Sequence, residues 1–166
     1  MKLWVDTEKL GSAGRAVRAT IQGQVEEINR QVLSRGVSAV NALRNAEMEV
    51  LNGQRSGKVY RKPYTGSLTK EERKKRKYKP PTYRASAPGE PPARRTGNLR
   101  LHWNGQVRKG AASGNGIEVI AELESQEEYA SMLENGTEKM APRPFVEQIK
   151  EKAMPEIEKI YGEPFS

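Results

Sequence analysis

Apolar residues recur at helical spacing through the first third of the chain. Between Ser12 and Asn52 they stand at Val17, Ile21, Val25, Ile28, Val32, Val40, Leu43 and Val50. The early steps of four, four, three and four place these side chains on one helical face, with charged residues opposite. Ser12 is a suitable N-cap, and Gly23 and Gly36 are the expected places for a bend or a break. The stripe is too irregular for a coiled coil, so we predict an amphipathic helix packed on a sheet.

The middle of the chain alternates in the manner of short strands. Residues 58–62 and 82–87 read as the two strands of a long hairpin. Residues 103–108 and 117–123 read as a second pair, joined by the glycine-rich segment 110–116. That segment lacks the Gly-Lys-Ser/Thr ending of a phosphate loop and precedes a strand, so we interpret it as a turn. Residues 3–5 are expected to form a short strand or an N-terminal anchor.

The last part of the chain returns to helical patterns. Residues 126–134 predict a short acidic helix with Tyr129, Met132 and Leu133 facing inward. Pro144 suits the first turn of a final helix, and Pro155 is expected to bend or interrupt that helix after Met154. The apolar positions of this helix are Phe145, Ile149, Ala153, Ile157 and Ile160. The fold class is therefore α+β, with the two long helices packed on a small antiparallel sheet and a long basic hairpin extension.

Length and composition predict one domain over residues 1–166, with residues 63–81 as a basic arm within it. Of the 166 residues, 35% are hydrophobic, which supports one core and leaves much polar chain outside it. The first residues lack the apolar region expected of a signal peptide, and no apolar run approaches the length expected of a membrane span. We therefore expect synthesis in the cytoplasm and no membrane partner.

The net charge of +8 is unevenly distributed. Residues 55–109 contain 17 Lys and Arg against three acidic residues, a net charge of +14, whereas the rest contains 12 against 18, a net charge of −6. The densest run is residues 69–81, with Lys74, Lys75, Arg76 and Lys77 at its centre. Such a run is expected to be exposed and mobile. It is consistent with a solvated loop or with an arm that contacts nucleic acid phosphates or an acidic protein surface, and Tyr78 and Tyr83 are candidates to stack on bases.

Chemistry-bearing residues are sparse. There is no cysteine and only one histidine, His102, which excludes disulfides, thiolate zinc sites and multi-histidine metal clusters. His102 has no local nucleophile or acid pattern, and the acidic residues around 118–138 contain no distinctive pair. We therefore expect neither an enzyme nor a bound metal or cofactor.

Two sequence blocks carry a more specific signal. The first comprises Ser56–Arg61, then Ala85–Ala93 and Thr96–Arg100, and the second is Tyr129–Phe145. Together and in this order they resemble the phage neck and tail-completion family typified by a tail component of the lambdoid phage HK97. The likeness covers about residues 12–161. The segment 63–81 is longer and more basic than expected of that family, and Leu101-His102-Trp103 replaces small polar residues.

This resemblance implies a structural protein of a tailed-phage virion, placed in the neck between the head connector and the tail. Such head–tail joining proteins form rings of six or twelve copies around the DNA channel, with portal, adaptor or tail-tube proteins as neighbours. Basic and acidic surfaces of this chain suit the heterologous contact that closes a ring. The alternative is a basic nucleic-acid-binding protein with no virion role.

The residues singled out fall into two groups. Candidates for the assembly interface are Lys74, Lys75, Arg76, Lys77, Glu134, Gly136, Thr137, Arg143 and Phe145. Residues expected to form a structural motif are Tyr60, Pro88, Gly89, Pro91, Pro92, Thr96, Gly97 and Leu99. Thr96 is expected to cap a short helical turn, and Gly97 and Gly136 to adopt backbone angles closed to other residues. A Glu134–Arg143 ion pair is expected to clamp the loop around Gly136.

Overall fold

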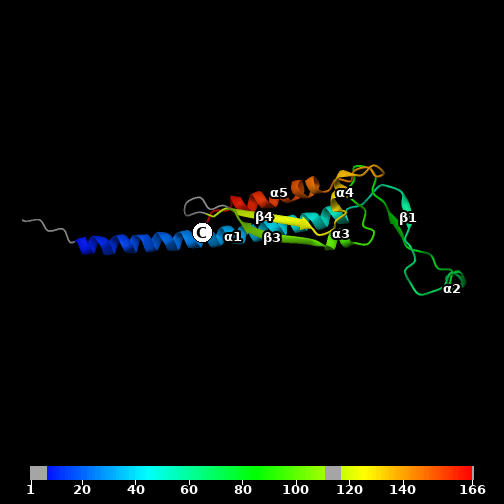
Figure 1. Ribbon diagram of the computed structural model, residues 1–166, viewed down its shortest axis with the longest axis horizontal. Helices are drawn as coiled ribbons and strands as arrows, with labels where there is room; N and C mark the ends of the chain where they lie inside the picture. Colours follow the sequence, from blue (N-terminus) through cyan, green and yellow to red (C-terminus); the bar gives the residue numbers. More distant parts are fainter. Residues whose placement is uncertain (1–6, 111–116, 166) are drawn as a thin grey trace, which may run out of the picture. The chain divides into compact units, whose positions relative to one another are not determined.

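The computed structural model describes residues 7–110 and 117–165, and it confirms the α+β class (Figure 1). The predicted elements at residues 3–5 and the tip at 111–116 lie outside the described residues. The elements in chain order are α1 (Thr7–Asn52), β1 (Val59–Arg61), α2 (Lys70–Lys75), β2 (Thr82–Arg84), α3 (Asn98–Leu101), β3 (Trp103–Lys109), β4 (Val119–Ser125), α4 (Ala130–Asn135) and α5 (Val146–Gly162).

The chain divides into two compact units. Unit 1 comprises Met1–Asn41, Gly105–Glu122 and Glu156–Ser166, and unit 2 comprises Ala42–Asn104 and Leu123–Pro155. The division falls within α1, β3, β4 and α5. The single domain predicted from length remains a prediction, which the cooperativity of unfolding would test.

Helix α1 continues through Gly23 and Gly36, so neither glycine breaks it, and the alternative of a bend stays a prediction. The reason is clear at Gly36, which is buried in unit 1 against the sheet. A Cβ there would lie 2.6 Å from Val119 Cγ1 and 3.0 Å from Val107 Cγ1. Gly36 therefore serves the close approach of the helix to β3 and β4. This contact confirms that α1 packs on a sheet.

Both strand pairs are antiparallel hairpins. In the first, β1 pairs with β2 with Tyr60 opposite Tyr83, and the two rings stack with centroids 5.8 Å apart. In the second, β3 pairs with β4. Backbone bonds at the two ends, from Gly110 N to Glu118 O (2.8 Å) and from Gln126 N to His102 O (2.9 Å), set its antiparallel register.

The core of unit 2 is small and centres on Phe145. This side chain is 1% exposed and meets Trp103 edge to face, with ring centroids 6.2 Å apart. Ile149 and Ala153 of α5 extend the same buried surface, as their spacing predicts. Helix α1 contributes mainly alanines to the core, and short side chains allow neighbouring elements to lie close to its backbone.

Three local predictions are corrected. Helix α4 begins at Ala130, and Tyr129 and Met132 are 38% and 56% exposed, so of the three side chains predicted to face inward only Leu133 is half-buried. Helix α5 continues through Pro155. Proline has no backbone N–H, so the carbonyl of Glu151 loses its usual helical donor, but Glu151 is exposed and water can reach that carbonyl. Thr96 is not the N-cap of α3. That position belongs to Gly97, whose φ of 101° no other residue adopts readily.

Candidate assembly interface

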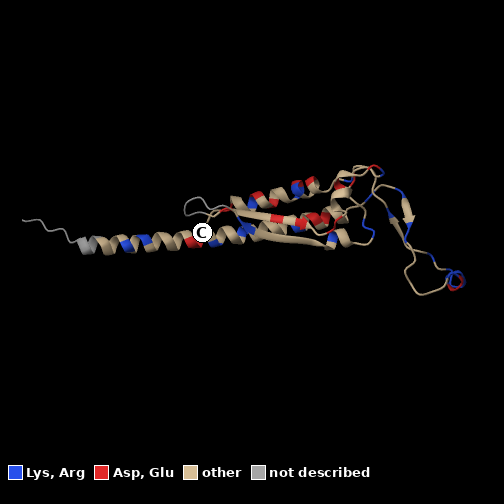
Figure 2. Cartoon of the chain, viewed as in Figure 1, with Lys and Arg blue, Asp and Glu red and all other residues tan. Residues whose placement is uncertain are grey.

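The basic run forms the outer end of the β1–β2 arm in unit 2 (Figures 1 and 2). It is partly helical rather than an open extension. Thr69 and Glu72 form a capping box, in which each side chain bonds the backbone amide of the other. This Thr-x-x-Glu pattern is visible in the sequence and was missed there. The hydrogen bonds to Thr69 lower the pKa of Glu72.

An aromatic cluster closes the end of the arm. Tyr64 and Tyr78 meet edge to face, with centroids 5.2 Å apart, and the guanidinium of Arg73 lies 4.2 Å from the Tyr64 ring centre. The Tyr64 hydroxyl also accepts a hydrogen bond from Leu68 N at 2.8 Å. Tyr78 and Tyr83 were candidates in the sequence for stacking on nucleic acid bases. Both rings already have aromatic partners within the chain.

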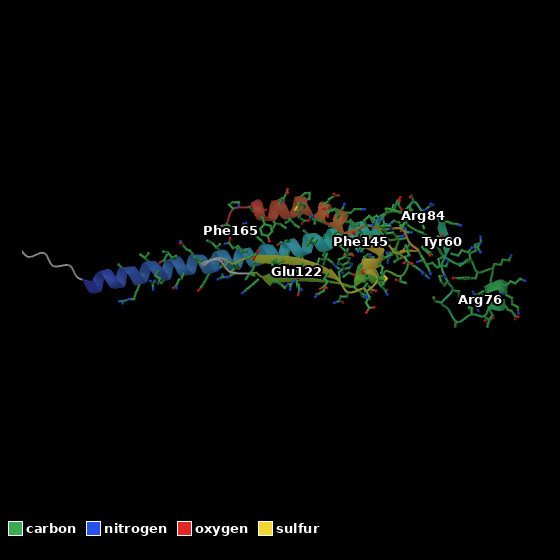
Figure 3. The ribbon with its side chains drawn as sticks, turned by 45° about the horizontal axis from the view of Figure 1, so that its top comes forward. Tyr60, Arg76, Arg84, Glu122, Phe145 and Phe165 are labelled. Carbon is green, nitrogen blue, oxygen red and sulfur yellow. The ribbon has the colours of Figure 1, made fainter. Side chains whose placement is uncertain are left out.

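Lys74, Lys75, Arg76 and Lys77 are all exposed beyond this cluster, and Arg76 is labelled at the end of the arm in Figure 3. None of the four side chains has a hydrogen-bond or ion-pair partner among the described residues. Lys77 ends the turn with φ 48°, an unusual angle for a lysine. The arm thus presents four unpaired cations on an ordered support.

The base of the arm is fixed by Glu90. Its carboxylate accepts hydrogen bonds from the Ser56 hydroxyl, from Ser56 N at 3.0 Å and from Ala87 N at 2.8 Å. These bonds lower its pKa to about 2. Two segments of the first sequence block, separated by the arm, are therefore joined by one side chain.

The structure brings the two sequence blocks together. Arg143 donates from Nη1 to the carbonyl and hydroxyl of Ser86, and to Ala87 O at 3.1 Å. Gly89 N donates to Pro142 O at 3.1 Å. The positive φ of Gly89 supports this turn, whose neighbours Pro91 and Pro92 are buried.

The expected Glu134–Arg143 pair is replaced by other contacts. Glu134 Oε2 accepts hydrogen bonds from Phe145 N (2.8 Å) and Val146 N (3.2 Å), so it caps the start of α5. Gly136 has φ 78°, as predicted, and a Cβ there would lie 2.8 Å from Met140 O. The spacing of residues in the sequence did not reveal this cap, because the loop brings Phe145 N and Val146 N to Glu134 only in the folded unit.

The candidate interface residues thus separate into two kinds. The four arm cations and Thr137 are exposed, whereas Phe145 lies in the core and Arg143 is committed to Ser86. Of the expected motif residues, Tyr60, Pro88 and Thr96 are exposed and Leu99 is half-buried.

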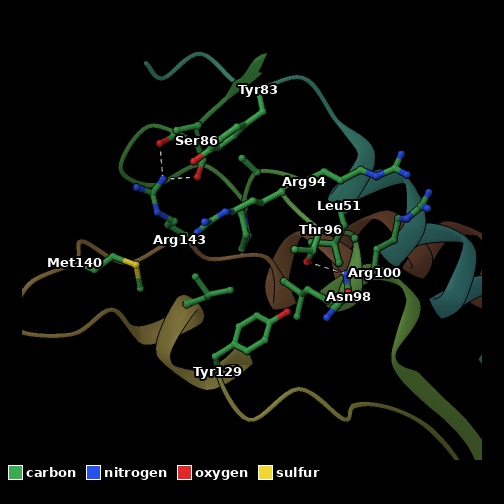
Figure 4. Close-up of a pocket in the computed structure, with 17 residues that line it drawn as sticks. Leu51, Tyr83, Ser86, Arg94, Thr96, Asn98, Arg100, Tyr129, Met140 and Arg143 are labelled. Carbon is green, nitrogen blue, oxygen red and sulfur yellow. Dashed lines mark hydrogen bonds between the residues drawn. The ribbon is translucent and has the colours of Figure 1, made fainter. Parts of the chain in front are cut away.

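A groove of about 620 Å³ opens in unit 2 beside the joined blocks (Figure 4). Four arginines line it, namely Arg94, Arg95, Arg100 and Arg143, together with apolar side chains that include Leu51, Leu133 and Met140. Sequence reasoning did not identify this groove, although Arg94-Arg95 directly after the proline-rich segment marked one edge of it.

Unit 2 also contains a buried carboxyl group, that of Glu47. It is 0% exposed, and its Oε2 is 3.2 Å from Arg44 Nη1 without forming an aligned hydrogen bond. Burial raises the pKa of Glu47 to about 7, although Arg44 and Arg100 both act to lower it. The charges around this group are therefore only partly balanced.

His102 and the strand residue Glu122 have structural partners. His102 Nδ1 pairs with Glu127, and Glu122 pairs with Arg108, which lowers the pKa of Glu122. Over residues 7–110 and 117–165 no group of His, Asp or Glu side chains is arranged to hold a metal ion. None of the described helices has the length and hydropathy required to cross a membrane.

Comparison with protein-family models, with curated proteins and with solved structures finds no match to this chain.

Proposed function

We propose that this chain is a structural component of a tailed-phage virion, a neck or tail-completion protein that assembles as a ring joining the head connector to the tail. The sequence resemblance supplies the family, and the surface of the folded chain supports an assembly role. The observation that carries the proposal is the exposed apolar face of α1.

In unit 1, every residue of α1 from Gly11 to Gln24 is exposed. Val17, Ile21 and Ile28 share one helical face and are 59%, 49% and 44% exposed. Helices in water depend mainly on packing of their apolar face, because intrinsic propensity alone gives marginal stability. An amphipathic face of this length is therefore suited to burial by another polypeptide.

The arm supports the same role. Its basic end is ordered by a capped helix and an aromatic cluster. Because this segment is already ordered, it loses less conformational entropy when a partner binds. Unpaired cations suit an acidic protein surface of a neighbouring subunit or of a portal, adaptor or tail protein. Tyr78 and Tyr83 are occupied by ring contacts within the chain, so the stacking expected of a single-strand binder has less support.

The first experiment removes the apolar face. Val17→Ser, Ile21→Ser and Ile28→Ser together should abolish ring formation and incorporation into particles. A matched control, Arg18→Ser with Glu26→Ser, changes exposed residues on the charged face of the same helix and should assemble normally. Normal assembly of the apolar triple variant would refute the role of this face.

The second experiment addresses the arm. Replacing Lys74, Lys75, Arg76 and Lys77 with serine should impair head-to-tail joining, whereas Lys74→Arg, Lys75→Arg and Lys77→Arg keep the charge and should preserve it. Imaging of purified particles should place the chain at the collar. Its absence from particles, together with binding to duplex DNA that weakens steeply with salt, would favour the nucleic-acid-binding alternative.

A further inference from the structure

The groove of unit 2 has unbalanced positive charge. Arg94 and Arg95 are exposed and have no hydrogen-bond or ion-pair partner among the described residues. None of the residues that line the groove is acidic. Figure 4 shows the Arg94 side chain extending across the groove toward Arg143. A guanidinium group binds a carboxylate through two parallel hydrogen bonds, so this surface is suited to carboxylates.

The other two arginines are held in place by the fold. Arg143 is fixed by Ser86, and Arg100 donates from Nη1 to Asn52 Oδ1 at 3.1 Å. The buried Nε of Arg100 has no hydrogen-bond partner. Side chains that are already fixed lose little conformational entropy when a ligand binds, so Arg100 and Arg143 are preorganised for binding.

The walls between the arginines are apolar or aromatic. Leu51, Leu133 and Met140 contribute aliphatic surface, and Tyr83 and Tyr129 contribute rings. Phosphate groups gain nothing from such walls, whereas a protein surface that mixes carboxylates with apolar side chains matches both parts of the groove. The ligand class indicated is therefore an acidic and partly apolar protein segment.

The chain itself carries such a segment on α5. At 100° per residue, Glu147, Glu151, Met154, Glu158 and Tyr161 fall within an arc of roughly 80°. All five are exposed, and they lie away from the buried side chains of Ile149 and Ala153. Glu151 and Glu158 have no hydrogen-bond or ion-pair partner among the described residues, and Glu147 has only the exposed Lys150. Acidic positions are coloured red along this helix in Figure 2.

We propose that the arginine groove of one copy binds this carboxylate face of α5 in the next copy. The inference rests on the proposed ring assembly and specifies its contact. The two surfaces are different parts of one chain, so the contact is heterologous, and repetition of it generates a closed ring or an open filament. Repulsion between the positive charges of two grooves also disfavours groove-to-groove pairing, which fixes the orientation of neighbours.

A charge exchange tests the contact in the full chain. Arg94→Glu with Arg95→Glu, and separately Glu151→Arg with Glu158→Arg, should each weaken self-association by at least about tenfold in sedimentation experiments. All four changes in one chain should restore it. Lys109→Glu with Lys159→Glu makes the same change in net charge as the groove variant, at exposed positions outside both surfaces, and it should have little effect. Circular dichroism checks that each variant is folded.

The outcomes separate the inference from the function it rests on. If the unaltered chain forms rings and the Arg94→Glu, Arg95→Glu variant forms them equally well, the groove contact is wrong and the ring assembly stands. If the unaltered chain stays monomeric at every concentration, the ring assembly itself is wrong. If the groove variant loses only affinity for a labelled DNA duplex, the groove binds nucleic acid and the inference is overturned.

Discussion

At the scale of single residues, Glu47 shows how burial sets the behaviour of a charged group. Its side chain is 0% exposed, and its pKa is raised to about 7 because desolvation outweighs the attraction of Arg44 and Arg100. The folded state therefore holds the proton more tightly than the unfolded state does. This raises the free energy of unfolding below the unfolded pKa of 4.5, and the gain is lost as the pH rises to about 7.

Glu47→Gln should remove that pH dependence. Between pH 4.5 and pH 7 the unaltered chain should lose up to about 3 kcal/mol from this group, while the glutamine variant should not. Urea unfolding of both proteins at pH 5 and pH 8 measures the difference, which isolates Glu47 from other titrating groups. Parallel pH profiles for the two proteins would contradict the assignment.

Phe145 allows a second residue-scale prediction, because its burial conflicts with a direct interface role. Phe145→Ala should lower the free energy of unfolding by about 3–5 kcal/mol through the cavity left beside Trp103. Met132→Ala, at a 56% exposed position, is the control and should change it by less than about 0.5 kcal/mol. Thermal or urea unfolding gives both values. A small effect of Phe145→Ala would mean that the side chain is not in the core in solution.

At the scale of elements, α2 shows how a short motif gives order to a strongly charged segment. Six residues rich in like charge form a helix because the Thr69–Glu72 capping box satisfies two backbone amides at its start. Glu71 and Glu72 in the first turn and lysines in the last turn also have the signs that the helix dipole favours. The order of the arm is therefore local in origin.

Thr69→Ala should loosen α2 without unfolding either unit. Loss of the cap should cost about 1 kcal/mol of local helix stability. The amides of Glu72 and Arg73, which bond to Thr69, should then exchange with solvent several times faster. Thr69→Ser retains the hydroxyl and should behave like the unaltered chain. Equal exchange rates in the alanine variant would show that the aromatic cluster alone orders the arm.

At the scale of the whole molecule, charge is separated by sequence region and displayed on different elements. The central region, residues 55–109, carries a net charge of +14 and contains the arm and three of the four groove arginines, while the flanks carry −6. Exposed charges of opposite sign attract neighbouring copies, and dissolved salt screens this attraction. The apolar face of α1 gains from burial at any salt concentration.

Self-association should therefore weaken with salt but not disappear. Raising salt from about 0.1 M to about 1 M shortens the screening length from about 10 Å to about 3 Å, and the association constant should fall accordingly. The Val17→Ser, Ile21→Ser, Ile28→Ser variant should lose association at all salt concentrations. Sedimentation at both salt concentrations measures this, and an association constant that did not change with salt would rule out a charged contact.

Local pattern determined where most elements lie and of what kind they are. The periodicity of α1 and α5, the alternation of β1 to β4 and the turn residues Gly97 and Gly136 predict the α+β class, because each signal depends on neighbours within a few residues. The capping box of α2 was equally local and could have been found in the sequence.

Tertiary structure alone decided which distant groups meet. Arg143 bonds Ser86 and not Glu134, and Glu134 instead caps α5. Gly36, where a break in α1 was expected, lets the helix lie close to the sheet. The arginine groove likewise joins residues from 51 to 143 that no spacing rule connects. Such contacts depend on how loops close in three dimensions, and the energy that selects among them comes from burial and hydrogen bonding between segments far apart in the chain.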